Sequence, residues 1–359
     1  FGIQLGTFKN YGITLSPKLK SRVQKLEEEI ESLEQRFQNN LGLSLNKPIH
    51  VAIDEQTLSG IPESAKRMMH DLAKTQQEDS LGVSAKQAVR IPVMECADNR
   101  ALREVVYKSW ATAASDIGDG GAALDNRPIA ERLLLLRYQM ARCLGKKNHA
   151  EVMTDGRMAG KPEKVLRFLN SLRQKVRQNA RAEIAKLKKF SKSELGHDLE
   201  PWDVEYAKSR FLKKQFGFTA RDLGPYLVFP RVLATLFELA RKMYGVEVRE
   251  RPDVKGWLPH VRFFEVYEHS GNLAGGFYLD PYARVGDVLK SESLWTQDML
   301  TRRKTGKREI RLPTVIIHLN LPFSEEPHLQ HLSHQDVIGL FHEFGHMLQD
   351  VLVKSNYLA

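Results

Sequence analysis

The hydrophobic periodicity of this chain changes at Gly245, and that change constrains the fold more than any other sequence feature. Before Gly245, apolar residues recur every three or four positions over long stretches, which is typical of amphipathic helices. We expect helices at residues 17–42, from 63 onward, and at 99–117, 127–144, 162–190, 201–215 and 229–245. The sequence therefore predicts a mostly α protein in which residues 1–245 form a helical domain.

After Gly245 the pattern turns to short runs rich in β-branched and aromatic residues, which predict strands. These runs are residues 246–248, 261–267, 276–279 and 315–319, with a turn at 270–272 and a polar loop or irregular helix expected at 289–307. Residues 334–352 return to helical spacing. We expect a second domain at 246–359, in which a small antiparallel β element precedes one helix.

The charge and the cysteine content of the chain limit which partners and which cellular compartment fit it. The chain has 54 basic and 44 acidic residues, a formal net charge of +10, and much of the excess falls at helical spacing within 163–192. Phe168 and Phe190 are the only aromatic residues in that segment, so we interpret it as a solvated helix face and expect no nucleic-acid partner. The only two cysteines, Cys96 and Cys143, are too few for a disulfide framework and indicate a reducing compartment. No apolar run approaches the ~20 residues that a membrane span needs.

One motif carries chemistry: His342-Glu343-Phe344-Gly345-His346 lies inside the last predicted helix. Histidines four residues apart share one helix face, so His342 and His346 can bind a single Zn²⁺. Glu343 sits near that face and can take a proton from a metal-activated water without being a ligand. The motif predicts a zinc site with Glu343 as catalytic base. The alternative is a chance match whose histidines are ordinary core groups.

Four nearby residues also belong to metal-binding types, but we assign none of them to the metal. His328, His331 and His334 follow a proline-rich approach to the helix, and we expect them at the surface or at the helix cap. Asp350 lies one turn beyond His346. Its position along the helix axis takes it away from a metal held by the two motif histidines.

With the motif in place, the chain resembles the thimet oligopeptidase, neurolysin and oligopeptidase A family of zinc metallopeptidases. The signature-like segment is Phe341–His346, and the run from Gly276 to Arg284 resembles the family's β element before the zinc helix. Weaker similarity is found at 58–62, 141–145, 201–203, 230–233 and 261–266. The resemblance covers most of the chain from about Gly2 onward.

The resemblance implies a neurolysin-like fold whose two lobes flank a deep channel, and a monomeric endopeptidase that cleaves short unstructured peptides. It carries over His342 and His346 as ligands of one Zn²⁺ and Glu343 as the catalytic base. We also expect residues 261–280 to offer an edge with which an extended peptide can pair. The resemblance also implies an intracellular protein of the cytoplasm or of an organelle matrix, mitochondrion or plastid. One branch of the family processes imported precursor proteins in mitochondria.

Two departures from the family pattern change the expectation for this chain. The family's third zinc ligand is a Glu about two dozen residues past the motif, but only 13 residues follow His346 and none is Glu. Gly286 is followed by Asp287 where the family has Gly-Lys. We expect a fragment that lacks the third ligand, binds zinc weakly and shows little or no turnover alone. The other interpretations are an inactive peptide-binding or regulatory module and a nucleic-acid-binding helical protein with steeply salt-dependent binding.

Overall fold

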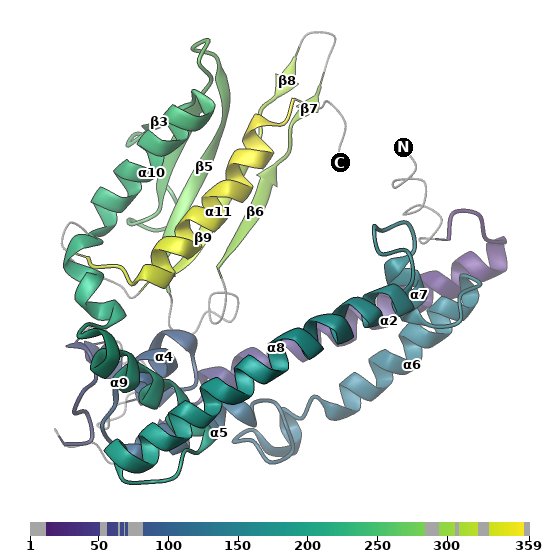
Figure 1. Cartoon of the computed structure of the whole chain (residues 1–359). Coiled ribbons are helices and arrows are strands. Elements are labelled where there is room, and N and C mark those ends of the chain that lie inside the picture. The colour runs from purple at the N-terminus through teal and green to yellow at the C-terminus, as the bar shows by residue number, and fades with distance from the viewer. Residues whose placement is uncertain are drawn as a thin grey trace. The chain divides into compact units, whose positions relative to one another are not determined.

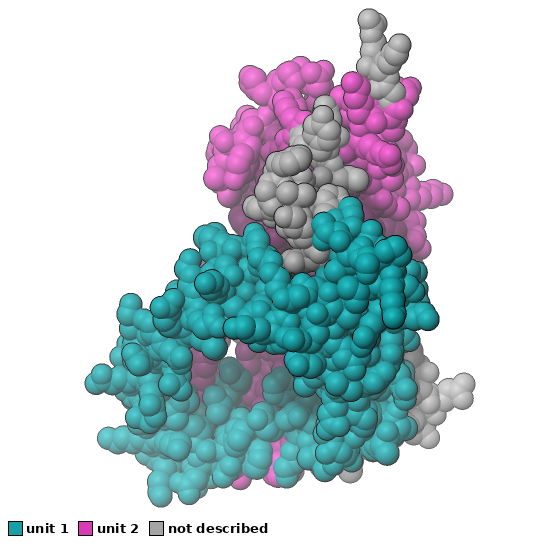
Figure 2. Space-filling model, turned by 90° about the vertical axis from the view of Figure 1, so that its right-hand side faces the viewer, with its two compact units in different colours: residues 1–47, 107–207 teal, residues 48–106, 208–359 magenta. Residues whose placement is uncertain are grey.

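The computed structural model describes residues 12–50, 56–63, 65–67, 69–70, 82–283, 294–305, 309–321 and 330–354. The chain divides into two compact units (Figure 2). One comprises Phe1–Lys47 and Tyr107–Ala207, and the other comprises Pro48–Val106 and Lys208–Ala359. The predicted domain boundary after Gly245 stays a prediction.

The first unit is built from helices. Its elements are α2 (Pro17–Asn46), η1 (Gly121–Ala123), α6 (Arg127–Cys143), α7 (His149–Thr154), α8 (Pro162–Phe190), the π-helical η2 (Ser191–Leu195) and η3 (Pro201–Asp203). Helices α2 and α6 pack through a cluster of Leu26, Ile30, Ile129, Leu133 and Leu136. Proline at the first position starts α2 and α8, where its missing N–H costs no helical hydrogen bond.

The second unit joins further helices to strands. Its helices are α4 (Gln87–Cys96), η4 (Ala220–Tyr226), α10 (Phe229–Tyr244) and α11 (His334–Leu352), while α5 (Arg100–Ala111) and α9 (Val204–Phe216) each span a boundary between the units. Two small antiparallel sheets are β1 (Pro48–His50) with β2 (Gly82–Ser84), and β7 (Arg303–Lys304) with β8 (Ile310–Arg311).

A five-stranded sheet in the order β3-β4-β5-β9-β6 positions the motif helix. Its strands are β3 (Glu247–Glu250), β4 (Arg262–Tyr267), β5 (Leu273–Tyr282), β6 (Trp295–Leu300) and β9 (Thr314–Leu321). Strand β9 pairs parallel with β5, in the register Phe277↔Val315, and the other pairs are antiparallel. The sheet is therefore mixed, and larger than the small antiparallel element expected from the sequence.

Helices α10 and α11 lie over one face of this sheet (Figure 1). Alternate residues of the strands, such as Phe264, Phe277 and Ile317, point to that face and are buried against the two helices. The centre of the core is aromatic: Phe277 stacks on Phe264 with ring centroids 5.1 Å apart and meets the Phe344 ring edge-on at 6.0 Å. Burial of this face fixes α11 on the sheet.

The mostly α fold predicted from the sequence is confirmed, and the predicted helix at 334–352 coincides with α11. Two helices were not predicted: α4, which contains Pro92, and the six-residue α7. Helix α2 runs past the stop expected at Gly42. The loop or irregular helix expected at 289–307 is wrong for residues 295–300, which form β6, and for residues 303–304, which form β7. Residues 284–293 and 306–308 lie outside the described residues. Within the described part of the chain, no helix is long and apolar enough to cross a membrane.

Candidate metallopeptidase site

Helix α11 is specified locally at its start. Ser333 is the N-cap: its hydroxyl accepts from the Asp336 backbone N–H (3.1 Å), and the Asp336 carboxylate accepts from the Ser333 N–H (2.8 Å). This capping box satisfies backbone donors that the first helical turn leaves unpaired. Leu340, Phe344 and Met347 then recur on one side and are buried. The packed side fixes the rotation of the helix, and therefore the direction in which the motif residues point.

The two motif histidines meet on the exposed side of α11. The Nε2 atoms of His342 and His346 lie 3.1 Å apart, and the ring centroids are 4.8 Å apart. Two Zn–N bonds of about 2.0–2.1 Å at a tetrahedral angle would place the nitrogens about 3.3 Å apart. The imidazole pair therefore fits one zinc ion, and soft-to-borderline nitrogen donors suit zinc chemically.

Glu343 is turned towards the sheet and is 6% exposed. Its Oε2 accepts a hydrogen bond of 2.8 Å from the hydroxyl of Thr296 on β6, which also lies 3.1 Å from the Glu343 backbone oxygen. The structure therefore places a buried carboxylate immediately after His342, on the helix whose exposed side carries the imidazole pair. Sequence reasoning missed Thr296 because it lies in the segment expected to be loop. Apolar and polar residues do not alternate cleanly along Trp295–Leu300, so periodicity gives no strand signal there.

Among the residues that the structure describes, no third protein ligand is found beside the histidines. No group of three His, Cys, Asp or Glu side chains that could hold a metal occurs among the residues the structure describes. Burial, together with the nearby Asp298 carboxylate, raises the pKa of Asp350, which disfavours the ionised form that a zinc ligand needs. His331 and His334 are exposed, and His334 is the first residue of α11. His328 lies outside the described residues.

Gly345 lies inside α11 with open space around it: a Cβ atom added there would meet nothing within 4 Å. Glycine in a helix interior costs roughly 0.5–1 kcal/mol relative to alanine. We therefore expect Gly345→Ala to raise the free energy of unfolding by about that amount, measured by urea denaturation. Gly339→Ala is the matched control, because its Cβ would lie 2.2 Å from Cδ1 of Leu294 and force that side chain to move. Equal stabilisation by both variants would contradict the argument.

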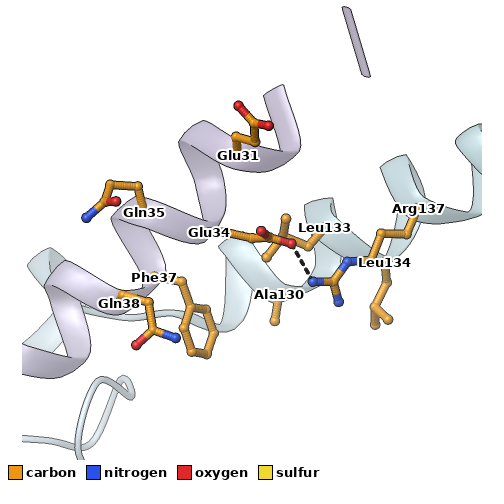
Figure 3. Close-up of a pocket in the computed structure, with 9 residues that line it drawn as sticks. All are labelled: Glu31, Glu34, Gln35, Phe37, Gln38, Ala130, Leu133, Leu134 and Arg137. Carbon is orange, nitrogen blue, oxygen red and sulfur yellow. Dashed lines mark hydrogen bonds and ion pairs between the residues drawn. The ribbon is translucent and has the colours of Figure 1, made fainter. Parts of the chain in front are cut away.

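A groove in the first unit has different chemistry (Figure 3). It has a volume of 770 Å³ and is lined by Glu31, Glu34, Gln35, Phe37, Gln38, Ala130, Leu133, Leu134 and Arg137. Glu34 and Arg137 pair across it at 2.6 Å. Its lining contains no histidine or cysteine, so it offers no counterpart of the imidazole pair on α11.

Comparisons with known proteins show the family of the chain. The model of peptidase family M3 matches residues 93–359. Oligopeptidase A of Salmonella typhimurium is 33% identical over 98% of this chain and 51% of the relative. In Arabidopsis thaliana, a probable cytosolic oligopeptidase A is 30% identical (96% of this chain, 50% of the relative), and an organellar oligopeptidase A, chloroplastic/mitochondrial, is 29% identical (96% and 44%). The chain spans about half the length of these relatives.

Proposed function

Because the chain belongs to peptidase family M3, we propose that it forms the His342–Glu343–His346 part of a zinc-dependent metallo-oligopeptidase. The observation that carries the proposal is the imidazole pair, with Nε2 atoms 3.1 Å apart, next to a buried carboxylate on the same helix. The substrates we propose are short unstructured peptides, and the protein acts as a monomer.

His342 and His346 would hold one zinc ion, which when bound supplies a water of lowered pKa and polarises a peptide carbonyl. The role of this chain's own residues follows from their positions. Each imidazole must be neutral to bind, so acid weakens the site. Glu343 accepts a proton from water and later returns it to the departing amine, as a general acid–base group does. Glu343 follows His342 directly in α11, and the Thr296 hydroxyl holds its buried carboxylate.

The sheet offers a place for an extended peptide, but not the one expected. Residues 261–280 fall in β4 and the first part of β5, and each of these strands already pairs on both sides, so that prediction was wrong. Strand β6 has β9 as its only neighbour in the described sheet, and it carries Thr296, which contacts Glu343. We propose that the substrate backbone pairs with β6, as in β-augmentation. A peptide-bound structure with the substrate away from residues 295–300 would remove this step.

Zinc binding tests the proposal directly. We expect residues 1–359 to bind zinc weakly, because two imidazoles leave the metal short of the three protein ligands usual in catalytic sites. His346→Ala should weaken binding by at least about 10²-fold, since even residues that only orient zinc ligands contribute 10–100-fold. Isothermal titration measures both affinities, and His334→Ala is the matched control on the same helix. Equal zinc affinity in all three proteins would contradict the assignment.

The lack of a third ligand among the described residues favours one other candidate, an inactive peptide-binding or regulatory module. A quenched-fluorescence peptide assay separates the two. Chelator-sensitive cleavage of short peptides, with a folded protein spared, supports the peptidase. Peptide binding with neither cleavage nor any zinc binding supports the module. The names of the Arabidopsis relatives leave both cytosol and organelle as proposed locations, which fractionation of the source cells would resolve.

A further inference from the structure

Thr296 connects the edge strand of the sheet to the motif helix. Its hydroxyl lies 2.8 Å from Glu343 Oε2 and 3.1 Å from the Glu343 backbone oxygen, a contact between residues 47 positions apart in the chain. A hydroxyl that donates to a carboxylate makes a charge-assisted hydrogen bond, which is stronger than one between neutral groups. The contact therefore fixes one particular oxygen of the proposed catalytic base.

The fold holds Thr296 in this position from both sides of the sheet. Thr296 pairs with Ile317 of β9, which is fully buried in the core under α11. The preceding residue, Trp295, points to the opposite face, where its ring stacks on His318 with centroids 4.3 Å apart. Because Trp295 is anchored on one face, the alternation of the strand directs the Thr296 side chain to the other, towards α11.

The close approach of β6 to α11 also depends on a glycine, Gly339. Gly339 lies one helical turn before Glu343, and a Cβ atom there would come within 2.2 Å of Cδ1 of Leu294, two residues before Thr296. The absence of that Cβ lets the start of β6 lie close to the helix. Backbone pairing, ring stacking and this close approach together limit where the Thr296 hydroxyl can lie.

We propose that Thr296 is a positioning residue for Glu343, an inference that rests on the proposed function. A carboxylate has two oxygens that can each accept hydrogen bonds. Thr296 occupies Oε2, and within the described residues no hydrogen bond to Oε1 is found. The two oxygens therefore have different roles. Oε2 is hydrogen-bonded to Thr296 of the sheet, and Oε1 faces the water whose proton Glu343 accepts.

Thr296→Val tests the proposal, because valine keeps the shape and removes the hydroxyl. In zinc-loaded protein that cleaves peptide, we expect kcat to fall about 10- to 10²-fold, since small misplacements of catalytic groups cost that much. KM and zinc affinity should stay unchanged, and Thr296→Ser should restore most of the rate. Thr314→Val is the matched control: it makes the same substitution on the neighbouring β9, opposite Leu300. A Val variant as fast as wild type, or one that loses zinc affinity in parallel with kcat, would overturn the proposal.

A second measurement does not need turnover. Thr296→Val, Glu343→Ala and the double variant form a thermodynamic cycle in which the urea midpoint of unfolding is measured. Residues in direct contact show non-additive effects, so the double variant should shift the midpoint by clearly less than the sum of the single shifts. Additive shifts refute the Thr296–Glu343 contact. Failure of the wild type to bind zinc counts against the proposed function alone, and the cycle then decides the contact.

Discussion

Glu343→Gln should reduce any zinc-dependent peptide hydrolysis by about 10²–10⁴-fold, the range that a positioned general acid–base group contributes. Glutamine has nearly the same shape and still accepts the Thr296 hydrogen bond through its amide oxygen, but it cannot take up a proton at neutral pH. The loss is therefore chemical rather than structural. It is measured as kcat for a short quenched-fluorescence peptide at saturating zinc.

Zinc affinity is the control for this variant. Glu343 is not one of the two residues assigned to the metal, so Glu343→Gln should bind zinc as the unmodified chain does, whereas His346→Ala should not. A Gln variant that keeps its hydrolytic rate would show that another group acts as the base. A variant that loses zinc together with activity would show that Glu343 supports the metal site and not the proton transfer.

Phe277→Ala should give the largest loss of stability, about 3–5 kcal/mol in the free energy of unfolding, the usual cost of removing a buried phenylalanine ring. Phe277 is fully buried on β5, stacks on Phe264 and touches Phe344 of the motif helix edge-on. Its removal leaves a cavity between the Phe264 and Phe344 rings, which cannot close without moving the helix. Urea denaturation followed by circular dichroism measures the effect.

Phe218→Ala is the control in the same unit. Phe218 is 52% exposed, so the same truncation removes few packed contacts and should cost far less. Equal losses from the two variants would contradict the view that the aromatic centre of the sheet supports α11. Because Phe277 contacts the face of α11 opposite the histidines, we also expect the Phe277 variant to bind zinc more weakly near its unfolding midpoint.

The limits of α11 could be predicted because the information is local. Its start is encoded by Ser333 and Asp336, three residues apart, and its packed face by apolar residues at helical spacing. The spacing of His342 and His346 likewise predicts that their rings meet, because a helix has a fixed geometry. The assignment of zinc to that pair, and of the base to Glu343, remains a proposal.

The sheet could be predicted only in part, because strands depend on distant partners. The run Trp295–Leu300 contains Thr, Gln and Asp, and its strand state comes from pairing with β9, about twenty residues later. Strand β5 extends from Leu273 to Tyr282 because β9 pairs with it in parallel, a crossover that periodicity does not reveal. The sequence suggests that strands at 261–280 can bind a peptide, and only the strand order shows that they already have neighbours on both sides.

By itself, the sequence determined the mostly helical class, the extent of the motif helix and the face on which its histidines lie, since all three depend on residues a few positions apart. Only the tertiary structure decided that β6 forms the sheet edge next to Glu343 and that the Thr296 hydroxyl holds Oε2. The reason is physical: a hydrogen bond between residues 47 positions apart exists only after the core has brought strand and helix together.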